Sequence, residues 1–441
     1  MSKNPIIRGT FILTTTGFLT RFIGFFFRMF LSHTFGEEQV GLYQLIFPLY
    51  ALCFSLSSAG IEIALSRNVE RKISMGKKSE ADTMLYQALL ISGCLSLILS
   101  CLLHKCATPL SIYILGDLRC EPLLKTLSLT LPFASIHSCI CGYYLGQKKT
   151  EIPAISQLCE QLGRVLSVYS IYKILEHNHT QATIGIAVLG LAIGEMLSAF
   201  FCMRHFTMRP HTRFGVATLQ KEKHLFRELT SLAMPLTSSR VLMNVLQSVE
   251  TISIPMCLQK FGHTSSEALG TYGVLTGMAL PCIFFPTAIT NSVSTVLLPT
   301  VAEIEAENNL VRLKALIQKV IFFGFGLGAI CGLVFLFFGS FFGKLLFQSS
   351  LAGDYLRTLA WICPFLYMNN TLISILNGLG KATNSFFINI TSLAIRIFGV
   401  WVGISTYGMQ GYLWGLLGSQ LIVSLLCICN LKWYIGSRQL E

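Results

Sequence analysis

The sequence predicts an all-α, polytopic membrane protein with about twelve transmembrane helices. Of its 441 residues, 53% are hydrophobic and only 12% are charged, against roughly 25% charged in a typical soluble domain. Apolar stretches recur along the whole chain, and each can supply the about 20 helical residues that cross a hydrocarbon core about 30 Å thick. A transmembrane β-barrel would instead alternate apolar and polar residues over short strands.

The expected spans form two sets of six. The first set is 9–32, 40–65, 82–103, 123–145, 153–174 and 183–204. The second set is 229–254, 268–298, 314–338, 355–377, 385–405 and 410–431. Pro255, Pro281 and Pro286 predict kinks or breaks, because proline removes a backbone donor. The longest polar interruption, from Arg204 to Arg227, predicts a cytoplasmic linker over 206–227 between lobes over 1–205 and 228–441.

The two lobes are expected to be pseudo-symmetric. Phe35-Gly36 followed by Gly41-Leu42-Tyr43 is similar to Phe261-Gly262 followed by Gly270-Thr271-Tyr272. Six spans in each half would keep both halves in the same orientation, with the substrate site between them. Chance similarity between apolar helices is the alternative.

Basic residues gather in alternate loops. They are Arg67, Arg71, Lys72, Lys77 and Lys78 after the second span, Lys148 and Lys149 after the fourth, Arg204, Arg209, Arg213, Lys221, Lys223 and Arg227 after the sixth, and Lys432 and Arg438 after the last. The positive-inside rule therefore predicts a protein of the cell inner (plasma) membrane with both termini in the cytoplasm.

The fifteen cysteines do not form a recognisable metal or redox motif. Most lie inside apolar runs, and no Cys-x-x-Cys pair has a matching partner. We therefore interpret them as packing residues and expect no metal and no cofactor. The sequence also has no nucleotide-binding loop and no catalytic signature, which predicts a protein that is not an enzyme.

Arginines within the expected spans are the main functional candidates. Arg21 and Arg28 are seven residues apart, which is about two helical turns, so both should face the same side of the first helix. An arginine at the bilayer centre costs about 3 kcal/mol on insertion scales. The predicted substrate-binding set is Arg21, Arg28, Arg164, Arg240 and Arg396. Snorkelling to an interface, or private pairing with a glutamate, are the alternatives.

Four glutamates also lie within expected spans and are candidates for ion coupling or ion pairing: Glu62, Glu160, Glu195 and Glu250. Glu160 precedes Arg164 by one helical turn, so a structural ion pair is an equal alternative there. His137 in the fourth span is expected to be a hydrogen-bonded packing residue, with a proton relay as the alternative.

Several motifs resemble one family of exporters. The opening motif is Thr20-Arg21-Phe22-Ile23-Gly24-Phe25 with Arg28, Gly36-Glu37-Glu38 and Gly41-Leu42-Tyr43. Further motifs are Ser58-Ala59-Gly60-Ile61, Ile155-Ser156-Gln157 with Glu160-Gln161 and Arg164, Tyr272-Gly273 with Leu275-Thr276-Gly277, and Ser294-Thr295 with Leu298-Pro299. Together they resemble the stage V sporulation protein B-like polysaccharide transport family of the multidrug/oligosaccharidyl-lipid/polysaccharide (MOP) exporter superfamily.

This resemblance implies two six-helix lobes around a cationic cavity, in which the first-helix arginines correspond to Arg21 and Arg28. The implied activity is the flipping of a pyrophosphate-linked lipid sugar by alternating access, for envelope or spore-cortex peptidoglycan assembly. The chain departs from the family at Glu62, where proline is usual. It also has about twelve spans where several relatives have fourteen, and it has no Lys or Arg between Phe261 and Val311.

The predicted function is therefore a flippase for a lipid-linked oligosaccharide or polysaccharide. The expected partners are the anionic saccharide lipid, membrane lipids and a coupling ion, proton or sodium. The protein should act as a monomer and bind no nucleic acid. A multidrug or cation antiporter of the MATE type is the alternative.

Overall fold

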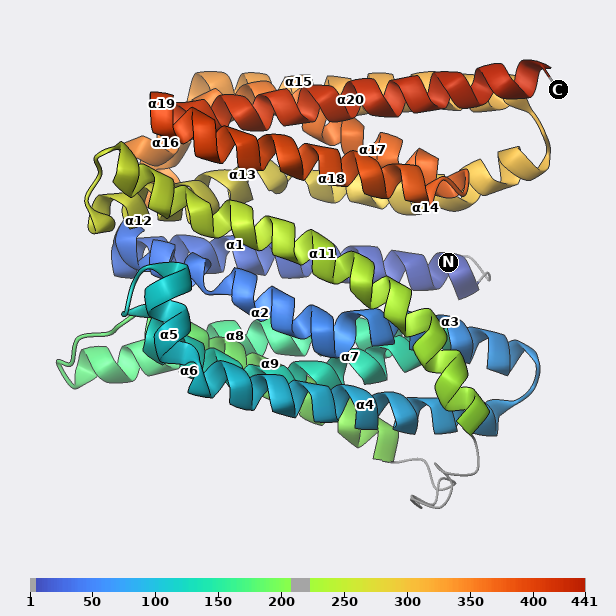
Figure 1. Ribbon diagram of the computed structural model, residues 1–441, viewed down its shortest axis with the longest axis horizontal. Helices are drawn as coiled ribbons and strands as arrows, with labels where there is room; N and C mark the ends of the chain where they lie inside the picture. The colour runs from blue at the N-terminus through green and yellow to red at the C-terminus, as the bar shows by residue number, and fades with distance from the viewer. Residues whose placement is uncertain (1–4, 208–222, 441) are drawn as a thin grey trace. The chain divides into compact units, whose positions relative to one another are not determined.

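The computed structural model describes residues 5–207 and 223–440. These residues form helices joined by short turns, and no β-strand occurs among them. The predicted all-α fold is therefore confirmed (Figure 1).

Membrane-spanning helices are numerous in the described part of the chain. Nine helices there are long and apolar enough to cross a membrane, or up to ten when the bent pair Cys120–Ser128 and Thr130–Gly146 is one span. The first, Phe11–Ser74, is 64 residues long. At 1.5 Å per residue such a helix would extend about 96 Å, far more than one membrane thickness. The protein is thus a multi-pass membrane protein, and the number twelve stays a prediction.

Two compact units make up the structure. The first contains the chain up to Phe27 together with Leu42–Ser248, and the second contains Arg28–Gly41 and everything from Val249 onward. The division into 1–205, 206–227 and 228–441 stays a prediction. Most of the expected linker, including Arg209, Arg213 and Lys221, lies outside the described residues.

The first unit is built from α1 (Pro5–Leu45, up to Phe27), α2 (Phe47–Phe54), α3 (Gly60–Ser74), α4 (Lys78–Lys105), α5 (Ala107–Pro109), α6 (Cys120–Ser128), α7 (Thr130–Gly146), α8 (Glu151–His177), α9 (Gly185–Thr207) and most of α11 (Lys223–Phe261). Within it α3, α4 and α7 contact one another, and α8 packs along α9. Its apolar core includes Leu65, Leu85, Tyr143 and Leu229, each fully or almost fully buried. Gly142 lets α7 approach the backbone of α3 at Glu62, where a Cβ would collide.

The second unit is built from part of α1, the end of α11, α12 (Ser265–Gly273), α13 (Leu280–Phe284), α14 (Thr287–Ala306), α15 (Leu310–Phe347), α16 (Ser350–Leu359), α17 (Cys363–Gly378), α18 (Ala382–Phe398), α19 (Ser405–Tyr407) and α20 (Met409–Leu440). Within this unit α14, α15, α17, α18 and α20 lie side by side (Figure 1). Its core includes Val301, Leu372, Ile375 and Cys427.

Short π-helical segments join several of these helices. They are η1 (Ser55–Ala59), η2 (Leu110–Leu115), η3 (Val274–Ala279) and η5 (Gly399–Ile404), while η4 (Ala360–Ile362) is a 3₁₀ turn. The break expected near Pro281 and Pro286 lies at 285–286, between α13 and α14, whereas α11 continues past Pro255. Gly36 and Gly262, which are matched in the proposed repeat, both have positive φ, 77° and 120°. Glycine suits both positions because it has no Cβ.

Candidate transport site

Arg21 and Arg28 lie on α1 before its kink at Gly36. Both side chains are exposed, although α1 belongs to an apolar candidate span. Arg21 falls in the first unit and Arg28 in the second. The shared cavity that we expect around them stays a prediction.

Arg240 lies on α11 within the first unit, and its side chain is also exposed. It is close enough to Glu62 of α3 for an electrostatic interaction. The Glu62 carboxylate also accepts a 2.8 Å hydrogen bond from Ser138 of α7. Glu62 therefore links α3 to α7 and lies within the field of Arg240.

The other candidate residues of the first unit, His137, Glu160, Arg164 and Glu195, form a polar cluster together with Tyr50. His137 and Glu195 are buried, and the other three residues are half-buried. Arg164 donates from Nη2 to Glu160 Oε1 at 2.5 Å. Glu195 is 8% exposed; His137 Nδ1 lies 3.5 Å from its Oε2, and the Tyr50 hydroxyl lies 3.5 Å from its Oε1. The structure thus places Arg164 in an ion pair and brings it near Glu195 and His137.

Two atoms of this cluster keep unused bonding capacity. Arg164 Nε and Glu195 Oε2 are buried, and neither makes a hydrogen bond in the described part of the chain. A buried polar atom without a partner costs about 1–3 kcal/mol. Each of these atoms could bond to a water molecule, an ion or another bound group.

His137 also belongs to a group that the sequence pattern did not reveal. One of its ring nitrogens and the sulfurs of Cys141 and Cys202 lie within 4.8 Å of one another, and so do one ligand atom each of His137, Glu160 and Glu195. We expected no metal centre because no Cys-x-x-Cys motif was present. The available signal was the His137 and Cys141 spacing of four on one helix face; Cys202 comes from another helix. In the structure Ser156 Oγ lies 3.0 Å from His137 Nε2 and 3.3 Å from Cys141 Sγ.

Glu250 and Arg396 meet within the second unit. Glu250 Oε1 accepts hydrogen bonds from Arg396 Nε at 2.7 Å and from the Tyr412 hydroxyl at 2.6 Å. The three residues join the end of α11 to α18 and α20. Arg396 is therefore in an ion pair, as one of the sequence alternatives allowed.

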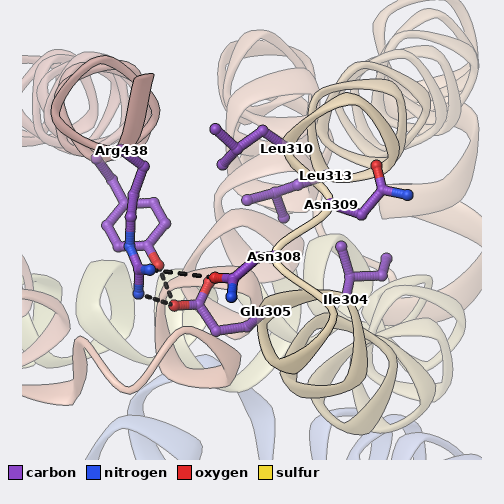
Figure 2. Close-up of a pocket in the computed structure, with 8 residues that line it drawn as sticks. Ile304, Glu305, Asn308, Asn309, Leu310, Leu313 and Arg438 are labelled. Carbon is purple, nitrogen blue, oxygen red and sulfur yellow. Dashed lines mark hydrogen bonds and ion pairs between the residues drawn. The ribbon is translucent and has the colours of Figure 1, made fainter. Parts of the chain in front are cut away.

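A cavity of about 250 Å³ lies where the turn between α14 and α15 meets the last turns of α20. Figure 2 shows Arg438 reaching across it, with Nη2 2.9 Å from Glu305 Oε1 and Nη1 3.2 Å from Asn308 Oδ1. Tyr434 also donates to Glu305. These bonds anchor the end of α20, and one of their groups, Arg438, was expected only as a basic residue of a loop.

Comparisons with known proteins agree with this architecture. The family described as "Polysaccharide biosynthesis protein" matches residues 6–305, and the family described as "MatE" matches residues 235–402. Stage V sporulation protein B of Bacillus subtilis (strain 168) is 26% identical over 432 residues, which cover 97% of this chain and 83% of that protein.

Two solved structures share the fold. The lipid II flippase MurJ, in an inward closed conformation, matches with a TM-score of 0.73 and 15% identity over 96% of this chain and 87% of that one. An inward-facing MATE multidrug resistance transporter of the MOP superfamily matches with a TM-score of 0.71 and 14% identity over 95% of both chains.

These relationships confirm the resemblance expressed by the sequence motifs. They also confirm the expectation of a transporter rather than an enzyme, because the matching families and folds are those of transporters and flippases. The chain belongs to the polysaccharide biosynthesis protein family, and its fold is similar to that of a transporter of the MOP superfamily.

Proposed function

We propose that the protein is a flippase for a lipid-linked oligosaccharide or polysaccharide of the peptidoglycan-precursor kind, with a cationic cavity that alternates between the two sides of the membrane. One observation carries the proposal: Arg21, Arg28 and Arg240 are exposed residues on long apolar helices. A charge at such a position needs water or an anionic partner. Guanidinium groups bind phosphate oxygens with paired hydrogen bonds, which suits a pyrophosphate-linked cargo.

The remaining arginines have a supporting role in this proposal. Arg164 and Arg396 already hold carboxylates at 2.5 and 2.7 Å. Arg164 still has a free Nε donor, through which it can join the cargo site.

We assign coupling to the polar cluster of the first unit. Glu195 is buried, and ligand atoms of His137, Glu160 and Glu195 lie within 4.8 Å of one another. Such a group of oxygen and nitrogen atoms can take up a proton or a sodium ion. In this scheme residues 1–205 and 228–441 rock against each other as lobes of a monomer in the cell membrane, with both termini cytoplasmic.

The test is flipping in proteoliposomes that contain a fluorescent prenyl-pyrophosphate-linked saccharide. Wild-type protein should move the lipid to the inner leaflet, and Arg21→Ala and Arg28→Ala should each reduce the initial rate by about tenfold or more, since each removes a charged hydrogen-bond donor. Arg312→Ala is the matched control, because Arg312 is exposed and paired with Glu307 near the start of α15. Normal flipping by the Arg21→Ala/Arg28→Ala double variant would refute the cationic cavity.

The second candidate function is a MATE-type multidrug or cation antiporter. The match of the MatE family to residues 235–402 favours it, as do buried carboxylates such as Glu195 and Glu250. Ethidium efflux from cells that produce the protein separates the two candidates. We expect efflux at the background level, whereas robust efflux that depends on Glu195 would favour the antiporter.

A further inference from the structure

A second cavity, of about 300 Å³, lies inside the second unit and is lined by amides. Five amide side chains from four helices surround it: Asn291 of α14, Asn369 and Asn370 of α17, Asn389 of α18 and Gln420 of α20. Among the described residues, none that lines the cavity carries a charge. Its size is at the lower end of the range for small-molecule sites.

The cavity is polar although it lies among helices that are apolar enough to cross a membrane. Asn370 and Asn389 lie near the middle of α17 and α18, and both helices are parts of candidate membrane spans. A polar side chain within a membrane span must be bonded within the protein or must face a hydrated space. The lining residues are thus polar although their helices have the apolar composition of membrane spans.

Part of the lining is bonded, and part is available to a ligand. Asn370 donates to Thr290 at 3.0 Å and to Asn291 at 2.5 Å. Asn369 donates to Gln420 Oε1 at 2.9 Å and accepts from Ser424 at 2.7 Å. In contrast, within the described part of the chain no hydrogen bond engages the Asn389 amide, although it lines the same cavity.

The cavity also lies beside a broken helix. Phe284 ends α13, Thr287 begins α14, and both residues line the cavity. In transporters, discontinuous membrane helices commonly border the substrate site, since their free backbone groups need a polar neighbour. The helix break and the amide side chains therefore border the same cavity.

The side chains that line the cavity indicate which kind of ligand it can bind. Amides present donors and acceptors together, which matches hydroxyl groups that also donate and accept. A phosphate would call for Lys or Arg, and a metal ion would call for carboxylates. Leu366, Ile373 and Val423 add apolar surface that suits the C–H face of a sugar ring.

We infer that this amide-lined cavity of the second unit binds the neutral sugar of the transported lipid. The inference rests on the proposed flippase function and adds to it a subsite for the uncharged part of the cargo. The hydroxyl groups of the sugar would bind to Asn389, Gln420 and their neighbours.

The experiment measures binding of two short-chain cargo analogues to the protein in lipid nanodiscs free of glycoside detergent. One analogue is a C10 prenyl pyrophosphate, and the other is the same lipid with N-acetylglucosamine on the pyrophosphate. Wild-type protein should bind the glycosylated lipid about tenfold more tightly, the effect of one or two added hydrogen bonds. Asn389→Leu should abolish this preference and leave the affinity for the bare lipid unchanged.

A milder pair of variants guards against misfolding. Ser392→Ala removes one hydroxyl from the cavity lining, and Thr391→Val removes the neighbouring exposed hydroxyl, which bonds to the Phe387 carbonyl. Ser392→Ala should reduce the preference, and Thr391→Val should keep it. If wild-type protein binds both lipids equally, or if Asn389→Leu retains the preference, the sugar subsite is wrong. If neither lipid binds, the flippase proposal itself fails, and the subsite fails with it.

Discussion

Arg396 Nε lies 2.7 Å from Glu250 Oε1, and that carboxylate is only 2% exposed. The Tyr412 hydroxyl donates to the same oxygen at 2.6 Å. The pair joins α11 to α18, and Tyr412 extends the connection to α20. The ion pair offsets part of the desolvation of the buried carboxylate, so Glu250 depends on Arg396.

Removing one partner of this ion pair should lower the stability of the protein more than removing both partners. Arg396→Met leaves the Glu250 carboxylate buried beside Tyr412 alone, and we expect a loss of about 3–5 kcal/mol of stability. The Glu250→Leu/Arg396→Met double variant should recover most of this loss, because no buried charge remains. Thermal midpoints of the purified proteins, read by size-exclusion chromatography, check the order. A double variant whose loss equals the sum of the single losses would contradict the pairing.

Lys72 and Lys77 provide a matched pair of lysines in the first unit. Lys72 Nζ lies 2.7 Å from Glu80 and 3.2 Å from Glu228, and its side chain is 9% exposed. Lys77 also contacts Glu80, but its side chain is 54% exposed. Lys72→Met should therefore lower stability by about 2 kcal/mol, because it removes two charged bonds. Lys77→Met should have little effect, as is usual for exposed pairs; equal midpoints for the two variants would argue against the buried role of Lys72.

Two glycines of α20 test the close packing of the second unit. A Cβ on Gly411 would meet the backbone of Gly403, whereas a Cβ on Gly418 would meet no atom within 4 Å. Gly411→Leu should therefore destabilise the protein by about 1–3 kcal/mol through overpacking. Gly418→Leu should leave the thermal midpoint near the wild-type value. A Gly418→Leu protein that is the less stable of the two would show that this packing is misassigned.

Glu195 tests the coupling assignment. Glu195→Gln removes the charge but keeps the shape, so uptake driven by an ion gradient should fall about tenfold, within the usual range of coupling energies. Flipping driven by the cargo's own gradient should persist. Glu176→Gln is the control, because Glu176 is an exposed carboxylate paired with Lys173 at 2.6 Å on α8. Gradient-driven uptake that survives Glu195→Gln would move the coupling site elsewhere.

Patterns of local sequence predicted much of the fold. The hydropathy of 18–25-residue windows depends on neighbouring residues alone, and it indicated a multi-pass α-helical membrane protein. The helix break near Pro286 was also predictable, because proline affects its own turn. The Glu160 and Arg164 pair followed from a spacing of one helical turn.

Contacts between distant segments were not predictable in this way. Glu250 and Arg396 are 146 residues apart, and no local sequence pattern around either residue predicts that the two are in contact. Asn291, Asn370, Asn389 and Gln420 are ordinary polar residues in separate helices, and only folding gathers them around one cavity. The same holds for Cys202, which joins His137 and Cys141 from another helix.

The sequence by itself determined the solvent of this protein, its helical class, its family and the presence of arginines within apolar helices. Only the tertiary structure decided that Arg396 pairs with Glu250 from a distant helix, and where uncharged amides converge. The reason is physical: the cost of a buried polar group belongs to one residue and can be read locally, whereas its compensation comes from whichever helix packs against it.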